Sequence, residues 1–182
     1  MRVPIDGAAG VGYLLRPGFD LPPLMFSVEE VEAIAVGLSL LERTADAGLA
    51  GAAQGVMRKI SDVLPQDRSY GRISESVLTS GWHNIPASSV DPGLIRQSIR
   101  DERKLKIEYR DVHNASSTRV VLPVALLYYV DAQVVAAWCE LRADYRHFRV
   151  DRIRQCETTD AFFAGRSAAL RERWQQQQGP NA

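Results

Sequence analysis

The sequence predicts an α+β protein in which a helical region is followed by a small, strongly bent β sheet or barrel. Three observations predict this class. Apolar residues recur at helical spacing between residues 27 and 64, apolar and charged residues alternate from residue 104, and apolar runs follow at 120–130 and 134–138. With 182 residues, 46% of them hydrophobic, the chain can bury the core of one ordinary domain or of two small ones.

The first 23 residues are rich in Gly and Pro and favour a strand and turn over a helix. Residues 11–15 form a short apolar run that ends at Arg16-Pro17-Gly18, a sequence typical of a turn.

The helical region begins at a capping box. Ser27 and Glu30 have the Ser-x-x-Glu spacing in which the two side chains cap each other's backbone N–H groups. A second helix is expected from about Leu49 to Leu64, closed by Pro65, and the two should pair as a helical hairpin. The apolar faces that predict them are Val31, Ile34, Ala35, Leu38 and Leu41 in the first helix, and Leu49, Ala52, Ala53, Val56, Met57, Ile60 and Leu64 in the second.

A third, short helix is expected after a loop that holds a candidate strand near 73–82. Asp91 is a typical N-cap and Pro92 suits the first helical position. The apolar face of this helix comprises Leu94, Ile95, Ser98 and Ile99.

Several strands follow. Leu105, Ile107 and Tyr109 alternate with charged residues, and Asp131-Ala132 should turn the chain between the two apolar runs. Strict alternation over 148–153 would bury Arg152, so a bulge or turn near Asp151 is expected there. That irregularity would let Phe148, Val150 and Ile153 face the core while Arg149 and Arg152 face outward. The residues from 166 to 178 fit either a helix or a glutamine-rich tail without structure.

Charge is unevenly distributed along a chain whose formal net charge is zero. From 27 to 64, six acidic residues oppose three basic ones, and from 96 to 154 twelve Lys and Arg oppose eight Asp and Glu. No run of about 20 apolar residues predicts a membrane span, and the N-terminus lacks a secretion signal, so we expect a cytoplasmic protein. Cys139 and Cys156 form neither a disulfide framework nor a metal motif, which suits free thiols in a reducing compartment.

The segment from Ala136 to Ile153 is the strongest functional signal, because an apolar strand leads directly into Arg142, Arg146, Arg149 and Arg152. Guanidinium groups pair bidentately with carboxylates and phosphates and stack on rings, so this density of Arg favours an anionic, nucleotide-like ligand. The alternative is that these arginines are solvated strand edges paired with nearby Asp residues. Trp138 fits either a platform that stacks on a base or ordinary core packing.

Catalytic and metal-binding chemistry find no support in the sequence. His83, His113 and His147 have neither metal-ligand spacing nor a companion nucleophile. Gly7, Gly10 and Gly12 are not followed by the Gly-Lys-Ser/Thr of a phosphate loop. We therefore expect a protein that is not an enzyme, with no catalytic residue, no metal site and no cofactor.

Four segments, in this order and spacing, together resemble the WYL-domain transcriptional regulators. They are Ile107-Glu108-Tyr109-Arg110, Arg119-Val120-Val121-Leu122-Pro123, Ala137-Trp138-Cys139-Glu140-Leu141-Arg142 and Phe148-Arg149-Val150-Asp151-Arg152-Ile153. Upstream, 10–16 resembles the β wing of that family's winged helix-turn-helix, and 20–26 resembles the link that follows it.

The resemblance implies a bacterial regulator in which a winged helix-turn-helix reads DNA, a helical linker assists dimerisation, and an Sm-like or SH3-like β barrel senses a ligand. That ligand would be nucleic acid, notably single-stranded DNA. The implied regions are a wing and linker remnant at 1–26, a helical dimerisation region at 27–90, the WYL barrel at 91–160 and a tail at 161–182. Taken with the Arg-rich segment, it implies these ligand-binding residues: Tyr109, Arg119, Arg142, Arg146, Arg149 and Arg152.

The sequence departs from this family pattern in two places. The name-giving Trp-Tyr-Leu falls on Gln133-Val134-Val135, and the chain starts at the wing, without the recognition helix that enters the major groove. We expect a homodimeric ligand-sensing part that meets operator DNA only through the missing helices. The alternative is a truncated fragment that binds partners or dimerises without reading DNA itself.

Overall fold

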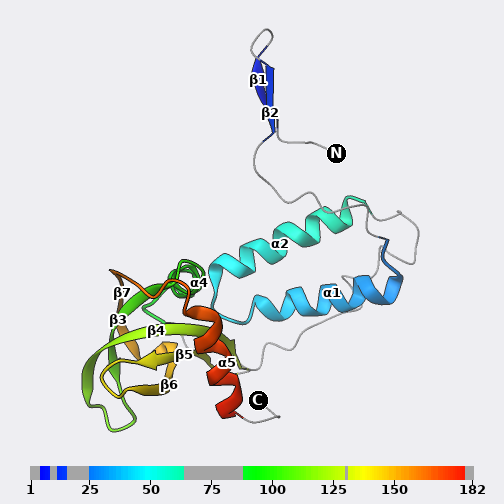
Figure 1. Cartoon of the computed structure of the whole chain (residues 1–182). Helices are drawn as coiled ribbons and strands as arrows, with labels where there is room; N and C mark the ends of the chain where they lie inside the picture. Colours follow the sequence, from blue (N-terminus) through cyan, green and yellow to red (C-terminus); the bar gives the residue numbers. More distant parts are fainter. Residues whose placement is uncertain (1–4, 9–11, 16–24, 64–87, 130, 179–182) are drawn as a thin grey trace.

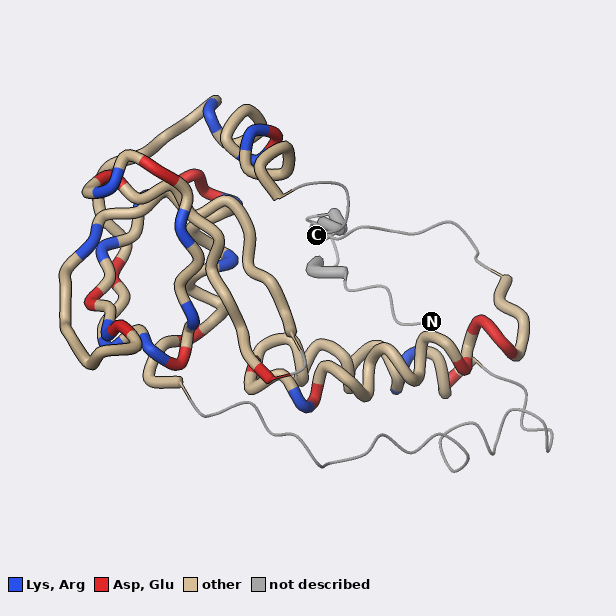
Figure 2. Tube along the Cα trace, turned by 90° about the horizontal axis from the view of Figure 1, so that it is seen from below, with Lys and Arg blue, Asp and Glu red and all other residues tan. Residues whose placement is uncertain are grey.

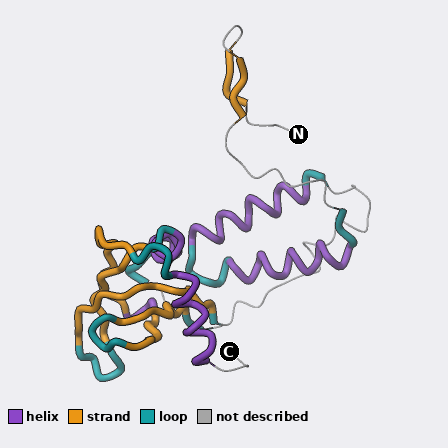
Figure 3. The backbone as a smooth tube through the Cα atoms, in the orientation of Figure 1, coloured by secondary structure: helices purple, strands orange, loops and turns teal. Residues whose placement is uncertain are grey.

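The computed structural model describes residues 5–8, 12–15, 25–63, 88–129 and 131–178. A two-stranded hairpin comes first, then two long antiparallel helices, then a sheet flanked by two further helices (Figures 1 and 3). In chain order the elements are β1 (Ile5–Ala8), β2 (Gly12–Leu15), α1 (Val28–Leu41), α2 (Ala47–Ser61), α4 (Pro92–Arg100), β3 (Arg103–Arg110), β4 (Ser116–Tyr128), β5 (Gln133–Cys139), β6 (Asp144–Arg149), the 3-10 turn η1 (Val150–Arg152), β7 (Ile153–Phe162) and α5 (Ser167–Gln178).

The N-terminal strand prediction is confirmed, because β2 pairs antiparallel with β1 in register from Ile5 opposite Leu15 to Ala8 opposite Gly12. The second strand of this hairpin, β2, lies within the segment 10–16 that resembles a wing. The candidate strand near 73–82 and most of the link at 20–26 lie outside the described residues.

The helical hairpin, defined as α1 and α2, forms as predicted. The Ser27 hydroxyl accepts the N–H of Glu30, and the Glu30 carboxylate accepts the N–H of Ser27 at 2.8 Å, which completes the capping box. The second helix begins two residues earlier than expected because Asp46 caps it by accepting the N–H of Leu49 at 3.0 Å. The two helices pack through Val28, Val31, Ala35, Met57 and Ile60.

The predicted third helix is α4. Its N-cap is Asp91, whose side chain accepts the N–H of Gly93 at 2.8 Å, and Pro92 stands at the first helical position. Ile95 and Ser98 are buried against the sheet, as their spacing predicted.

The sheet has five antiparallel strands in the order β6-β5-β4-β3-β7. A ring contact shows that the sheet curls strongly. The centroids of the Tyr109 ring in β3 and the Phe148 ring in β6 lie 5.1 Å apart, edge-on, although β4 and β5 separate these two strands in the ladder. Within the described residues β6 and β7 remain the two ends of the hydrogen-bonded order, so the sheet is open. The prediction of a bent sheet is confirmed, and a closed barrel is not.

The concave face of the sheet holds the main core. The predicted irregularity near Asp151 is the turn η1, which lets Phe148, Val150 and Ile153 all point inward, with at most 5% of each residue exposed. Burial of such side chains is the largest stabilising contribution to a fold of this size. The buried members of this core are Val90, Ile95, Leu105, Ile107, Val121, Val135, Ala137, Cys139, Phe148, Val150 and Ile153.

The convex face is covered by α5, so the C-terminal segment adopts the helix of its two predicted alternatives (Figure 1). Trp138 packs in this second cluster, its ring edge-on to Tyr145 at 5.2 Å, which assigns Trp138 to core packing. The Tyr145 hydroxyl donates to the carbonyl of Leu170 at 2.7 Å, and the Trp174 indole N–H donates to His147 Nε2 at 3.2 Å.

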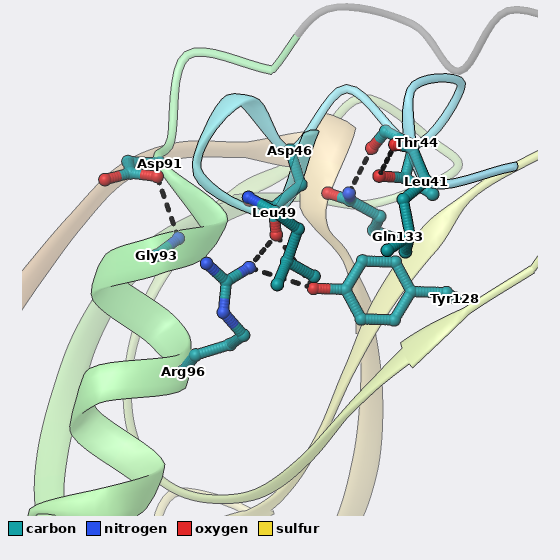
Figure 4. Close-up of polar contacts among 9 residues, drawn as sticks. All are labelled: Leu41, Thr44, Asp46, Leu49, Asp91, Gly93, Arg96, Tyr128 and Gln133. Atoms are coloured by element: carbon teal, nitrogen blue, oxygen red, sulfur yellow. Dashed lines mark hydrogen bonds and ion pairs between the residues drawn. The ribbon is translucent and has the colours of Figure 1, made fainter. Parts of the chain in front are cut away.

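The helical hairpin meets the sheet at a polar junction, formed by Thr44, Asp46, Arg96, Tyr128 and Gln133 (Figure 4). Asp46 is only 1% exposed. Its carboxylate pairs with the Arg96 guanidinium and accepts the Tyr128 hydroxyl at 2.8 Å, while Arg96 also donates to that hydroxyl at 3.0 Å. The buried Gln133 amide donates to the carbonyl of Thr44.

Burial raises the pKa of Tyr128, an effect that the neighbouring Arg96 partly offsets. The hydroxyl therefore keeps its proton at neutral pH and can donate to Asp46. Among the described residues, no helix combines the length and the apolar character needed to cross a bilayer.

Replacing Asp46 by Asn tests the polar junction. The amide can still cap α2, but Arg96 loses its buried counter-charge. Because the Arg96 side chain is partly exposed, the free energy of unfolding in urea titrations should fall by about 2–3 kcal/mol, less than the roughly 3–5 kcal/mol of a fully buried pair. Asp91→Asn is the matched control, because Asp91 is an exposed N-cap and its change should cost under about 1 kcal/mol. Equal losses would contradict a special role for Asp46.

The contact between His147 and Trp174 predicts a pH dependence. Burial lowers the pKa of His147, and Nε2 accepts a hydrogen bond only while unprotonated. The folded state thus binds fewer protons than the unfolded state, whose His pKa is about 6.5. The contribution of neutral His147 to the free energy of unfolding should therefore be complete above about pH 6.5 and should decline as the pH falls below that value.

Thermal unfolding at pH 7.5 and 5.5 measures this effect. His147→Gln keeps an acceptor that does not titrate, so the drop in Tm between the two pH values should be smaller in the variant than in the wild type. The same drop in both proteins would refute the prediction.

Candidate ligand-binding site

A pocket of about 310 Å³ lies at the end of the concave face, beyond the apolar core. Side chains two residues apart on a strand point to the same face of the sheet. Arg119 therefore points to the same face as buried Val121, and Arg146 to the same face as buried Phe148. The same face therefore changes from apolar to cationic where the core ends. The lining residues are Tyr109, Asp111, Arg119, Arg142, Arg146, His147 and Phe148, and we name this site the arginine pocket.

Two walls of the arginine pocket come from β3 and β4. The Tyr109 ring is fixed by its edge-on contact with Phe148, and Tyr109 lies opposite Ser117 in the ladder. Arg119 Nε donates to the Ser117 hydroxyl at 3.1 Å, which orients the guanidinium and leaves its other nitrogens for a ligand.

The third wall comes from the turn between β5 and β6 and from β6 itself. Arg142 lies in this turn, which Ala143 closes with a φ of 49°, and the Arg142 side chain is exposed. Arg146 pairs with Asp144 at 3.2 Å, but both side chains are about half exposed, so this pair contributes little and can exchange for a ligand anion. With three Arg and one Asp among its lining residues, the arginine pocket carries net positive charge.

Four of the six predicted ligand residues, Tyr109, Arg119, Arg142 and Arg146, thus meet in one pocket. Arg149 does not line it. The Arg149 guanidinium binds the Asp151 carboxylate bidentately at 3.0 and 3.1 Å, hydrogen bonds that raise its pKa, and approaches Asp131 at 3.8 Å. Arg152 lies half-buried in η1, outside the lining.

Sequence reasoning missed Asp111 as a residue of the site. Its Oδ1 accepts the backbone N–H groups of His113 and Ala115 at 2.8 and 2.9 Å within the turn between β3 and β4. These bonds, chiefly the one from Ala115, lower the pKa of the carboxyl, so it is ionised at neutral pH. The signal that could have located it is an Asp at the end of an alternating strand with an Asn three residues later, two residue types that favour turns. In the structure Asn114 has a φ of 65°.

The described residues contain no group of three or more His, Cys, Asp or Glu arranged to hold a metal ion. Cys139 is buried in the core, and burial raises the pKa of the Cys156 thiol to about 11, which keeps that thiol protonated and unreactive. The arginine pocket supplies cations, an aromatic ring and one carboxylate. The cations and the ring suit the binding of an anion that carries an aromatic group.

Charge is also partitioned at the scale of the whole molecule. Acidic residues gather toward the start of α1, whereas over the sheet and its turns Lys and Arg are interspersed with Asp and Glu and outnumber them by twelve to eight between residues 96 and 154 (Figure 2). A ligand with negative charge would therefore be attracted to the half of the molecule that holds the arginine pocket.

The part of the chain that forms the sheet matches a known domain family. Residues 93–158 match the family model of the WYL domain. The match runs from α4 into β7 and includes every residue of the arginine pocket. Among solved structures, the proteasome accessory factor B/C (PafBC) of Arthrobacter aurescens is similar to this chain at 25% sequence identity, with a TM-score of 0.39. The similarity covers 81% of this chain and 22% of that one, so the chain spans about a fifth of the length of that relative.

The different surroundings of Arg149 and Arg142 predict different effects on stability. Arg149→Ala breaks a half-buried bidentate pair and should lower the free energy of unfolding by about 0.5–1 kcal/mol. Arg142→Ala removes an exposed turn side chain and should change it by less than about 0.5 kcal/mol. Urea titrations compare the two, and a larger loss for Arg142→Ala would contradict the assignment of Arg149 to a structural pair.

Proposed function

We propose that this chain is the ligand-sensing part of a WYL-family transcriptional regulator, and that the arginine pocket binds an anionic effector, a single-stranded oligonucleotide or a nucleotide. The observation that supports this proposal is the gathering of Arg119, Arg142 and Arg146 around Tyr109 at the end of the core. Guanidinium groups match phosphate oxygens, and aromatic faces accept bases without regard to sequence. No catalytic step is part of the proposal.

The size of the arginine pocket suits one nucleotide-sized group. About 310 Å³ is at the lower end of the range for small-molecule sites. A longer strand would place one nucleotide in the pocket and extend along the neighbouring turns. In this proposal the curled sheet fulfils the role of the Sm-like barrel expected of the family.

Effector binding must favour one arrangement of the molecule over another to regulate anything. The polar junction is the place where such a change can pass to the helical hairpin, because β4 holds Arg119 near one end and Tyr128 at the other. A coupling of about 1–3 kcal/mol would change the affinity for operator DNA by roughly 5- to 150-fold. In this proposal the protein acts as a homodimer, and operator DNA is read by helices outside this sequence or by another chain.

A second candidate function is a partner-binding or dimerisation fragment. The helical hairpin exposes Val36, Leu40 and Val56, each by 38–44%, and Met25 just before α1 is almost fully exposed. Exposed apolar side chains on paired helices are typical of surfaces that bind another helix. Loss of effector binding with retained dimerisation would favour this candidate.

Fluorescence anisotropy with labelled single- and double-stranded oligonucleotides tests the proposal. We expect the wild type to prefer single strands and to lose affinity as salt rises. Replacing Arg142 and Arg146 together by Ala removes two phosphate contacts, so the slope of log K against log salt should become shallower by about 1.4.

Arg154→Ala with Arg173→Ala is the matched control, because both arginines are exposed and neither lines the arginine pocket. This control should keep the wild-type slope. Arg149→Ala with Arg152→Ala separates the two Arg groups: loss of binding only in that double variant would move the site to η1. No salt-dependent binding by the wild type would refute the proposal.

A further inference from the structure

The arginine pocket contains a carboxylate that a simple phosphate site would not be expected to have. Asp111 lines the pocket together with Arg119, Arg142 and Arg146, and it is ionised. A negative charge at this place opposes the binding of any ligand that presents only phosphate oxygens.

The role of Asp111 in the chain turn does not require that charge. A single oxygen, Oδ1, accepts both backbone N–H groups, from His113 and from Ala115. The amide oxygen of Asn could accept the same two bonds, and Asn is as common as Asp in such turns. The turn therefore needs only one of the two carboxylate oxygens.

The second oxygen, Oδ2, has no hydrogen-bond donor within the described part of the chain. The side chains of His113 and Arg152 lie near Asp111, but neither forms an ion pair with it. An acceptor that is fixed in place by backbone bonds, borders a pocket and lacks a donor is suited to select a ligand.

We infer that Asp111 is a specificity-determining residue of the arginine pocket, which selects an anion that also carries a hydrogen-bond donor, such as the exocyclic amine of a nucleobase, over a bare polyanion. The inference rests on the proposed function and adds the chemistry of the ligand. A phosphate would lie against the arginines, and a base amine within reach of that phosphate would donate to Oδ2. A donor that meets a fixed carboxylate forms one of the stronger hydrogen bonds in proteins.

Asp111 favours a ligand with an amine in two ways. A ligand with an amine gains a charge-assisted bond to Asp111, and a ligand without donors meets only repulsion. Hydrogen bonds to charged groups are stronger than those between neutral groups, so the combined preference should be about tenfold or more.

The test compares two labelled single-stranded probes, a deoxycytidine hexamer, which carries amines, and an abasic hexamer of tetrahydrofuran units, which has the same phosphates, no bases and no hydroxyl at C1′. Each is titrated by anisotropy against the wild type and against Asp111→Asn. The variant keeps the oxygen that the turn needs and replaces Oδ2 by a neutral donor. We expect the ratio of the two affinities, cytidine over abasic, to fall about tenfold in Asp111→Asn, with tighter binding of the abasic probe.

Stacking of cytosine on Tyr109 raises that ratio equally in both proteins, so it does not affect the comparison. Asp160→Asn is the matched control, because it also removes one negative charge, from a fully exposed carboxylate that pairs with Arg103 at the far end of β3. Its ratio should equal that of the wild type. Circular dichroism and thermal unfolding check that each variant is folded.

The outcomes of this test distinguish a failure of the inference about Asp111 from a failure of the proposed function. If the wild type binds both probes in a salt-dependent way and Asp111→Asn leaves the ratio unchanged, Asp111 does not select the ligand, and the proposed function still stands. Equal tightening of both probes would overturn the inference in the same way, since it reports only general charge. If the wild type binds neither probe, the proposed function and this inference both fail.

Discussion

The buried carboxylate of Asp46 is the contact on which the arrangement of the two parts of this molecule depends. It starts α2 through the N–H of Leu49, and it also pairs with Arg96 of α4 and accepts the hydroxyl of Tyr128 at the end of β4. A charge removed from water must be paired or it costs several kcal/mol, so the helical hairpin cannot move away from the sheet without exposing or separating this pair. The orientation of α2 and the position of the sheet edge are therefore fixed by the same side chain.

A second constraint is the curl of the sheet, which produces the arginine pocket. The contact between Tyr109 and Phe148 closes the end of the concave face, and β3, β4 and β6 continue beyond it. Residues on that face past the last apolar layer have no core to enter. Arginine is suited to this boundary because its methylene stem packs against apolar neighbours while its charged end reaches solvent or a ligand.

Local signals in the sequence predicted the helices and strands, whereas the candidate site depends on contacts between residues far apart in the chain. The capping box at Ser27, the Asp91-Pro92 pair and the alternation through Tyr109 each act within a few residues, so each predicted an element correctly. The arginines of the 136–153 segment have different roles, and strand register together with η1 decides which role each one takes. Arg149 pairs with Asp151, whereas Arg146 faces the pocket. The pairing of Asp46 spans 50 residues to Arg96 and 82 to Tyr128, and no pattern in one sequence predicts a partner at such a separation.

Gln133 stands where the resemblance to the WYL-domain regulators would place the start of the Trp-Tyr-Leu triplet. Gln133 begins β5, is 3% exposed, and donates its side-chain amide to the carbonyl of Thr44 in the loop before α2. It lies at the polar junction and not among the residues that line the arginine pocket. An aromatic residue there would fill the contact between sheet and helical hairpin by apolar packing, whereas Gln fills it with a buried hydrogen bond whose loss would leave polar groups unsatisfied. Under the proposed function, this departure from the family pattern therefore acts on how the two parts are joined, and any effect on effector binding would have to pass through the polar junction.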